Sequence, residues 1–122
     1  MLTVIHILSL LIALEHFLFL ILEMFLWTKP LGRKVFGQTK SKAETTALLA
    51  ANQGLYNGFL ASGLLWGVFN SNKVFGIEVI TFFLVCIVVA GVYGGLTASK
   101  KIIYLQALPA IIGLSVIMLS EN

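Results

Sequence analysis

Charged side chains are scarce in this sequence of 122 residues. They make up 11% of the residues, whereas 59% are hydrophobic. Water-soluble globular domains carry about 25% charged residues, so the composition excludes an ordinary soluble domain. Lipid must be the solvent for most of the protein surface, and we expect an integral membrane protein.

Cysteine is also scarce, and the single Cys86 lies between Val85 and Ile87 in an apolar run. It has no partner in the chain for a disulfide, and no metal-ligand spacing surrounds it. We interpret Cys86 as a small core or lipid-facing hydrophobe.

The N-terminal segment lacks the pattern of a cleaved secretory signal. Such signals combine a basic start, an apolar run of about 7–15 residues and a small-residue cleavage site. Residues 1–27 do not show this combination. We therefore expect the first apolar segment to stay in the mature protein.

Four long apolar runs are separated by polar or Gly/Pro-bearing stretches. They cover residues 2–27, 46–69, 74–98 and 102–119. Each is long enough to cross a hydrocarbon core of about 30 Å as a helix. A transmembrane barrel is excluded, because it needs many alternating segments of about ten residues. The sequence predicts an all-α fold, a four-transmembrane-helix bundle that forms a single domain over residues 1–122.

The basic residues indicate the orientation of this bundle. The first connection, residues 28–43, holds Lys29, Arg33, Lys34, Lys40 and Lys42. The third connection holds Lys100 and Lys101, and the second holds only Lys73. Lys and Arg near span ends favour the cytoplasm. We expect the first and third loops inside and both termini outside, in the plasma membrane. This distribution also explains the net charge of +3, so no nucleic-acid partner is expected.

The first connection also contains Pro30, Gly32 and Gly37. We expect it to form a short bent segment on the lipid headgroups. Its basic residues either anchor the topology or bind an anionic lipid or ligand, and the sequence leaves both roles open.

Ionisable groups occur inside the predicted spans, where each costs roughly 2.5–3.5 kcal/mol on insertion scales. Glu15 and His16 lie near the middle of the first span. Glu23 follows His16 by seven residues, so the two side chains point nearly the same way at about 100° per residue. A pairing within the membrane or a functional site would explain such residues.

Amide and tyrosine side chains accompany these groups. In the second span they fall within an arc of about 140° on a helical wheel, and they are Asn52, Gln53, Tyr56 and Asn57. Tyr93 and Gln106 lie in the inner halves of the third and fourth spans. We predict that the residues converge in a polar intramembrane pocket open to the cytoplasmic side. A packing interpretation, in which the amides join helices, stays open.

The predicted roles in the pocket follow from residue type. Glu15 and His16 are the tentative catalytic residues. The ligand-binding set is Glu23, Asn52, Gln53, Tyr56, Asn57, Tyr93 and Gln106. No metal site is predicted, because no histidine pair or cysteine at ligand spacing accompanies the carboxylates. The residues identify no cofactor.

Small residues recur every fourth position on another side of the second span, at Ala50, Gly54, Gly58 and Ser62. Such a stripe lets a neighbouring backbone approach closely. Packing within one chain and a subunit interface both remain open, and we expect a homo-oligomer.

The runs "LEMFLWTKPLGRKVFG" (residues 22–37) and "LAANQGLYNGFLASGLLWG" (residues 49–67) strongly resemble the four-helix membrane proteins of the DUF1304 family. The resemblance covers nearly the whole chain. It implies the fold and a membrane location, and it implies no catalytic residues.

A fainter layout similarity is to the MAPEG group, the membrane-associated proteins of eicosanoid and glutathione metabolism. "GRKVFG" after the first span, Asn52 in the second and "YLQALPA" (residues 104–110) carry it. That similarity implies a trimer of four-helix subunits. The glutathione-binding pattern of that group is not matched, because Leu48 and Leu55 stand where Arg and Glu would flank Asn52.

Three functions fit these residues. A binding protein or membrane-embedded enzyme for a lipophilic or amphipathic small molecule would use Glu15 or His16 as acid or base. A small proton- or cation-coupled transporter would use Glu15 as its coupling site. A structural or regulatory subunit would bind a partner helix. We favour the first, because the crowded amide and tyrosine groups suit the orientation of a ligand. The substrate is not named by the sequence.

Overall fold

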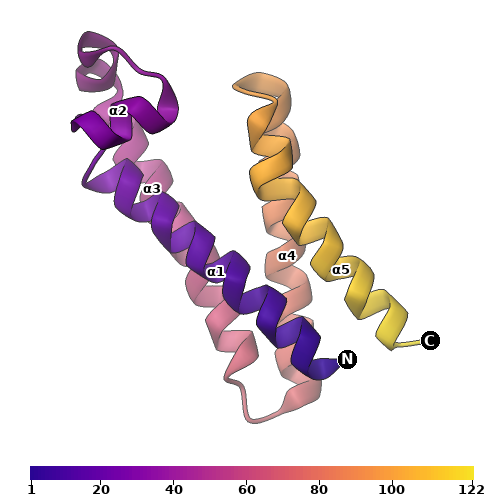
Figure 1. Cartoon of the computed structure of the whole chain (residues 1–122). Helices are drawn as coiled ribbons and strands as arrows, with labels where there is room; N and C mark the ends of the chain where they lie inside the picture. The colour runs from indigo at the N-terminus through magenta and orange to yellow at the C-terminus, as the bar shows by residue number, and fades with distance from the viewer. The chain divides into compact units, whose positions relative to one another are not determined.

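The computed structural model describes residues 1–122, and every regular element is helical (Figure 1). In chain order the elements are α1 (Leu2–Met24), α2 (Pro30–Phe36), α3 (Lys40–Val68), α4 (Lys73–Thr97), the π-helix η1 (Ile103–Ala107) and α5 (Leu108–Ser120). The prediction of an all-α chain is confirmed.

Three helices are long and apolar enough to cross a membrane. They are Leu2–Met24, Lys73–Thr97 and the continuous η1–α5 segment Ile103–Ser120. These helices indicate a membrane protein. The helix α3 is longer, with 29 residues, but it is not among the three because its sequence is more polar.

The chain divides into two compact units, which are described separately. The large unit consists of Met1–Ala13 and Ser62–Asn122, and the small unit is Leu14–Ala61. Because α1 and α3 each continue from one unit into the other, the division falls within helices and not in a linker.

In the large unit, α4 packs along η1 and α5. Its core is apolar, and the largest completely covered side chains in it are Leu64, Ile80, Leu84 and Ile87. Glycines allow the helices to approach closely. A Cβ atom added to Gly91 would lie 2.6 Å from the backbone nitrogen of Ala107, so no side chain fits at that position without movement of the backbone.

The π-helix η1 has a local cause in the sequence. Leu108 donates its backbone N–H to the Ile103 carbonyl, five residues back. Pro109 follows immediately and has no N–H to offer to the carbonyl of Leu105, which an α-helix would require. The wider turn therefore ends where the proline interrupts the regular hydrogen-bond pattern.

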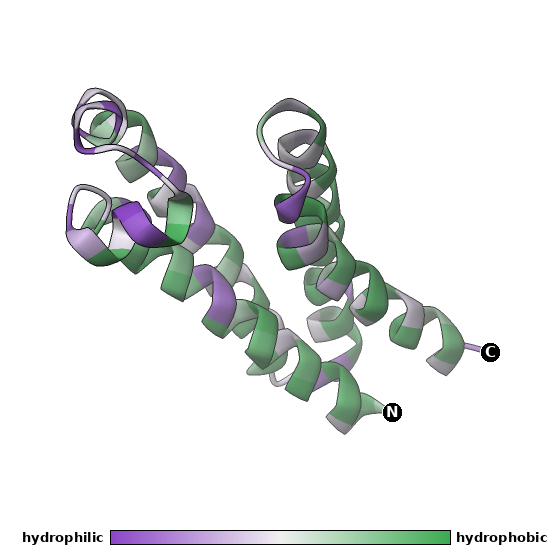
Figure 2. Ribbon diagram, turned by 45° about the horizontal axis from the view of Figure 1, so that its top comes forward, coloured by the Kyte–Doolittle hydropathy of each residue, from purple (hydrophilic) through white to green (hydrophobic).

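In the small unit, the C-terminal part of α1 lies beside the N-terminal part of α3, and α2 lies in the connection between them. Its buried side chains are small or polar rather than large and apolar, and they are Ala43, Ala50, Ala61, His16, Glu23 and Asn57. Figure 2 shows hydrophilic residues over α2, while α5 of the large unit is mostly hydrophobic.

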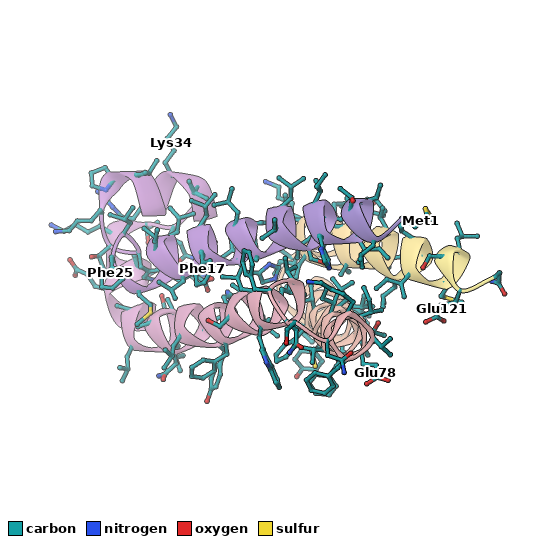
Figure 3. All side chains as sticks on the ribbon, turned by 90° about the horizontal axis from the view of Figure 1, so that it is seen from below. Met1, Phe17, Phe25, Lys34, Glu78 and Glu121 are labelled. Atoms are coloured by element: carbon teal, nitrogen blue, oxygen red, sulfur yellow. The ribbon has the colours of Figure 1, made fainter.

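The connection between α1 and α3 forms the short helix α2. Pro30 stands at its start, where a missing N–H costs nothing. Gly37 ends it in the left-handed conformation with φ 63°. Where the sequence analysis expected a short bent segment after the first span, the structure has a seven-residue helix. Figure 3 shows the Lys34 side chain pointing away from this helix.

Candidate functional site

The site is built on the contact between α1 and α3 in the small unit. Gly54 and Gly58 lie against α1. A Cβ atom added to Gly54 would lie 3.0 Å from the Glu23 Cβ, and one added to Gly58 would lie 2.5 Å from the Leu20 Cδ1. This part of the small-residue stripe therefore packs within the chain. The close approach brings polar groups of the two helices within reach of each other.

Glu23 and Asn57 form the centre of the site. The Asn57 side-chain amide donates a hydrogen bond of 2.7 Å to the Glu23 Oε1 atom. Glu23 is 3% exposed and Asn57 is 7% exposed. The second carboxylate oxygen, Oε2, is buried and has no hydrogen-bond partner. A buried acceptor left in this state costs roughly 1–3 kcal/mol, so the arrangement is unusual for a group that serves packing alone.

A second amide lies beside the same carboxylate. Gln53, one helical turn before Asn57, is close enough to interact with Glu23, although its side chain is exposed. The carboxylate therefore has Asn57 on its covered side and Gln53 toward the surface. A polar molecule at this site would meet an acceptor in the Glu23 carboxylate, which Asn57 orients, and an amide in Gln53.

Other predicted residues of α3 lie away from this pair. Asn52 is exposed, and its amide donates a hydrogen bond of 3.2 Å to the Leu48 carbonyl of its own helix. Tyr56 is 63% exposed. Its ring meets Phe59 edge-on, with centroids 5.8 Å apart. The structure thus places Asn57 against α1 and these two side chains on the surface of α3.

The two tentative catalytic residues differ in their surroundings. His16 is completely buried, and its ring contacts Phe19 edge-on at a centroid distance of 5.5 Å. Glu15 is half-buried. Neighbouring residues on a helix point about 100° apart, so the two side chains occupy different sides of α1.

Two further predicted ligand-binding residues belong to the large unit. Tyr93 is exposed on α4, and Gln106 is half-buried on η1. Gln106 therefore lies on a π-helical turn, a feature found frequently at functional sites. The structure contains no group of three or more His, Cys, Asp or Glu side chains placed to hold a metal ion.

Trp27 joins the three helical segments of the small unit at the end of the site. Its indole Nε1 donates a hydrogen bond of 3.1 Å to the Thr46 Oγ1 on α3. Its ring also packs on Phe36 of α2, with centroids 4.7 Å apart. No local sequence pattern links Thr46 to Trp27, because 19 residues separate them.

The comparison with protein families matches nearly the whole chain. The sequence pattern of the family described as "Protein of unknown function (DUF1304)" matches residues 10–118. The chain belongs to this family. As a DUF1304 member it is 38% identical over 110 residues to "Uncharacterized protein YpaA" of Lactococcus lactis subsp. lactis (strain IL1403). The alignment covers 88% of this chain and 91% of that relative.

The resemblance drawn from the two quoted runs is thereby confirmed. No solved structure matches this DUF1304 protein. The description of the family and the name of the relative assign no activity.

Proposed function

We propose that the chain is an integral membrane protein that binds a lipophilic or amphipathic small molecule at the Glu23–Asn57 site. The observation that supports this most directly is the buried Oε2 atom of Glu23, which has no hydrogen-bond partner. The other oxygen is held by Asn57. The carboxylate is therefore oriented and still has an acceptor to offer.

The chemistry of the site favours a ligand with a hydrogen-bond donor on an apolar body. An amine or hydroxyl group would supply the partner that Oε2 lacks. The amide of Gln53 would supply a further donor or acceptor at the rim. The surface around α1 and α3 is apolar at Leu18 and Leu55, which suits the rest of such a ligand. Glu15, which belongs to the same unit, is proposed as a further part of the pocket.

The proposed orientation makes α3 the fourth span of a single bundle. An α-helix of 29 residues is ~43 Å long at 1.5 Å per residue, which is enough to cross the bilayer. Three basic residues between α1 and α3, together with Lys40 and Lys42 at the start of α3, favour the cytoplasmic side for this connection. With Lys100 and Lys101 also inside, both termini lie outside the plasma membrane, and the Glu23–Asn57 site opens toward the cytoplasm.

A homo-oligomer is proposed as the state of the protein in the membrane. Asn52, Gln53 and Tyr56 are exposed on α3, and polar side chains in spans usually face other helices or a water-filled cavity. A neighbouring copy would cover them. A trimer is the arrangement that the layout of the MAPEG group implies.

The binding proposal is tested by the molecules that remain on the purified protein. Wild type, Glu23→Gln and Glu44→Gln would be purified in the same mild detergent and analysed by mass spectrometry. Glu44 is an exposed carboxylate on α3 and serves as the control. We expect a small molecule on wild type and on Glu44→Gln that Glu23→Gln loses. The same molecules in the same amounts on all three proteins would contradict the proposal.

A small proton- or cation-coupled transporter is the second candidate, supported by the half-buried Glu15 on the first span. Reconstituted vesicles distinguish it from a binding protein or an enzyme. Proton-driven flux of a candidate solute that Glu15→Gln abolishes would favour the transporter. A ligand that is bound or altered without crossing would favour the first proposal, with Glu15 and His16 as acid or base.

A further inference from the structure

The large unit contains a groove where α3 ends and α4 begins. Its volume is about 320 Å³, near the lower end of the roughly 300–1,000 Å³ found for small-molecule sites. The lining is almost entirely apolar, and it consists of Trp66, Phe75, Val79, Phe82, Phe83 and one charged residue, Glu78. None of these residues belongs to the Glu23–Asn57 site.

The aromatic rings in the groove form two edge-on pairs. The centroids of Trp66 and Phe75 are 5.7 Å apart at an interplanar angle of 71°. Those of Phe82 and Phe83 are 5.3 Å apart at 90°. In an edge-on pair the edge of one ring covers one face of the other, so a third group can reach only the remaining faces, and Phe75 and Phe82 are both exposed. The Trp66 side chain is 55% exposed, and the face of an indole ring is the strongest aromatic attractor of cations.

Glu78 adds a negative charge to this aromatic surface. Its side chain is exposed, and Figure 3 shows it at the outer surface of α4. Lys73, five residues earlier, directs its Nζ atom to the Asn70 carbonyl at 3.0 Å. The nearest basic residue along the chain is therefore held at the turn. Aromatic faces and one carboxylate together are complementary to a positively charged group with apolar substituents.

We propose that this groove binds an amphipathic organic cation, such as a quaternary or alkyl-substituted ammonium. Glu78 lies about 7.5 Å along α4 from Lys73 at 1.5 Å per residue, so the groove lies near the end of a helix that is apolar enough to span the membrane. At that level the charged group stays close to water while its substituents contact Trp66 and Phe75. The proposal does not depend on a ligand at Glu23.

The test uses phenyltrimethylammonium as the cation and tert-butylbenzene as its uncharged isostere, with the full chain in an uncharged maltoside detergent. In a Trp27→Phe background, Trp66 is the only tryptophan, so its fluorescence reports binding at the groove. Calorimetric titration of the chain with both tryptophans replaces fluorescence if Trp27→Phe does not fold. We expect saturable binding of the cation, and a Kd that is at least about five-fold higher in Glu78→Gln.

Two matched variants complete the experiment. Trp66→Leu should raise the Kd for the cation about three-fold or more, because it removes the indole face. Glu44→Gln, at an exposed carboxylate outside the groove, should leave the Kd unchanged. Equal Kd values for wild type and Glu78→Gln, or equal binding of tert-butylbenzene and the cation, would overturn the proposal. Displacement of the cation by lower concentrations of a short-chain phosphatidylcholine would also overturn it, because the occupant would then be a lipid headgroup.

Discussion

The Asn57 amide donates to the Glu23 carboxylate across the contact of α1 and α3, over 34 residues of sequence. Asn57→Leu removes the 2.7 Å hydrogen bond to Oε1, and should lower the free energy of unfolding by about 1–3 kcal/mol. Replacing both residues, as Glu23→Leu with Asn57→Leu, should cost less than Asn57→Leu alone, because no buried polar group is left unpaired. Thermal unfolding of wild type, Asn57→Leu, Glu23→Leu and the double variant in one detergent measures this. Strictly additive losses would show that the two side chains are not coupled.

The glycines of α3 should differ in their tolerance of alanine. At Gly58 the added Cβ meets the end of the flexible Leu20 side chain, whereas at Gly54 it lies 2.8 Å from the Met24 Cγ and 3.2 Å from the Leu20 backbone oxygen. Gly58→Ala should therefore be rescued by Leu20→Ala, while Gly54→Ala should lose about 1–3 kcal/mol that Leu20→Ala does not restore. Melting temperatures of the four variants test this. Equal rescue at both positions would contradict the helix contact described above.

Gly32 in α2 and Gly37 at its C-cap constrain the chain for different physical reasons and provide a matched pair. A Cβ atom at Gly32 would overlap the Leu26 backbone carbonyl, whereas Gly37 has open space but a positive φ of 63°. Gly32→Ala should cost more than about 2 kcal/mol or displace α2 from the preceding turn. Gly37→Asn should be nearly neutral, because Asn adopts this conformation at low cost. Hydrogen exchange of residues 26–36 would report the displacement, and similar protection in both variants would be evidence against the close contact.

The proposed orientation can be checked by chemical labelling. In a Cys86→Ala background, Lys40→Cys and Asn72→Cys should react with an impermeant thiol reagent from opposite sides of the membrane. The reason is that α3 lies between these two positions and is proposed to span the membrane. Labelling of both from one side would exclude the four-span arrangement.

Helix formation was largely predictable from the sequence, but the ends of the helices were not. The first predicted span, residues 2–27, ends three residues later than α1, because hydropathy remains high through Phe25 and Leu26. The second, residues 46–69, begins six residues later than α3, which starts at Lys40. A run of apolar residues indicates which part of a helix can be covered by lipid or by a protein core, and not where the helix begins or ends. Lysine forms helices well, but because it is charged it does not belong to an apolar run.

The candidate site was only partly predictable for a geometric reason. Asn52 and Asn57 are five residues apart, so their side chains point about 140° apart on a helix. One neighbouring helix cannot cover so wide an arc, and α1 covers the side of Asn57, Gly54 and Gly58. A helical wheel shows which residues share an arc, but the contact partner decides which part of that arc is buried. Which part of the arc is buried therefore depends on contacts between residues far apart in sequence.

The five-residue turn at η1 has a consequence for the length of the chain. A π-helical turn accommodates one residue more than an α-helical turn, so it acts like a single-residue insertion placed before Pro109. The buried positions that follow it, Ala110, Gly113 and Ile117, keep their places because the wider turn absorbs that extra residue. A relative shortened by one residue within 103–107 could preserve the same covered face by closing the turn, so this is the place in the last helix where the family can change length without reordering its core.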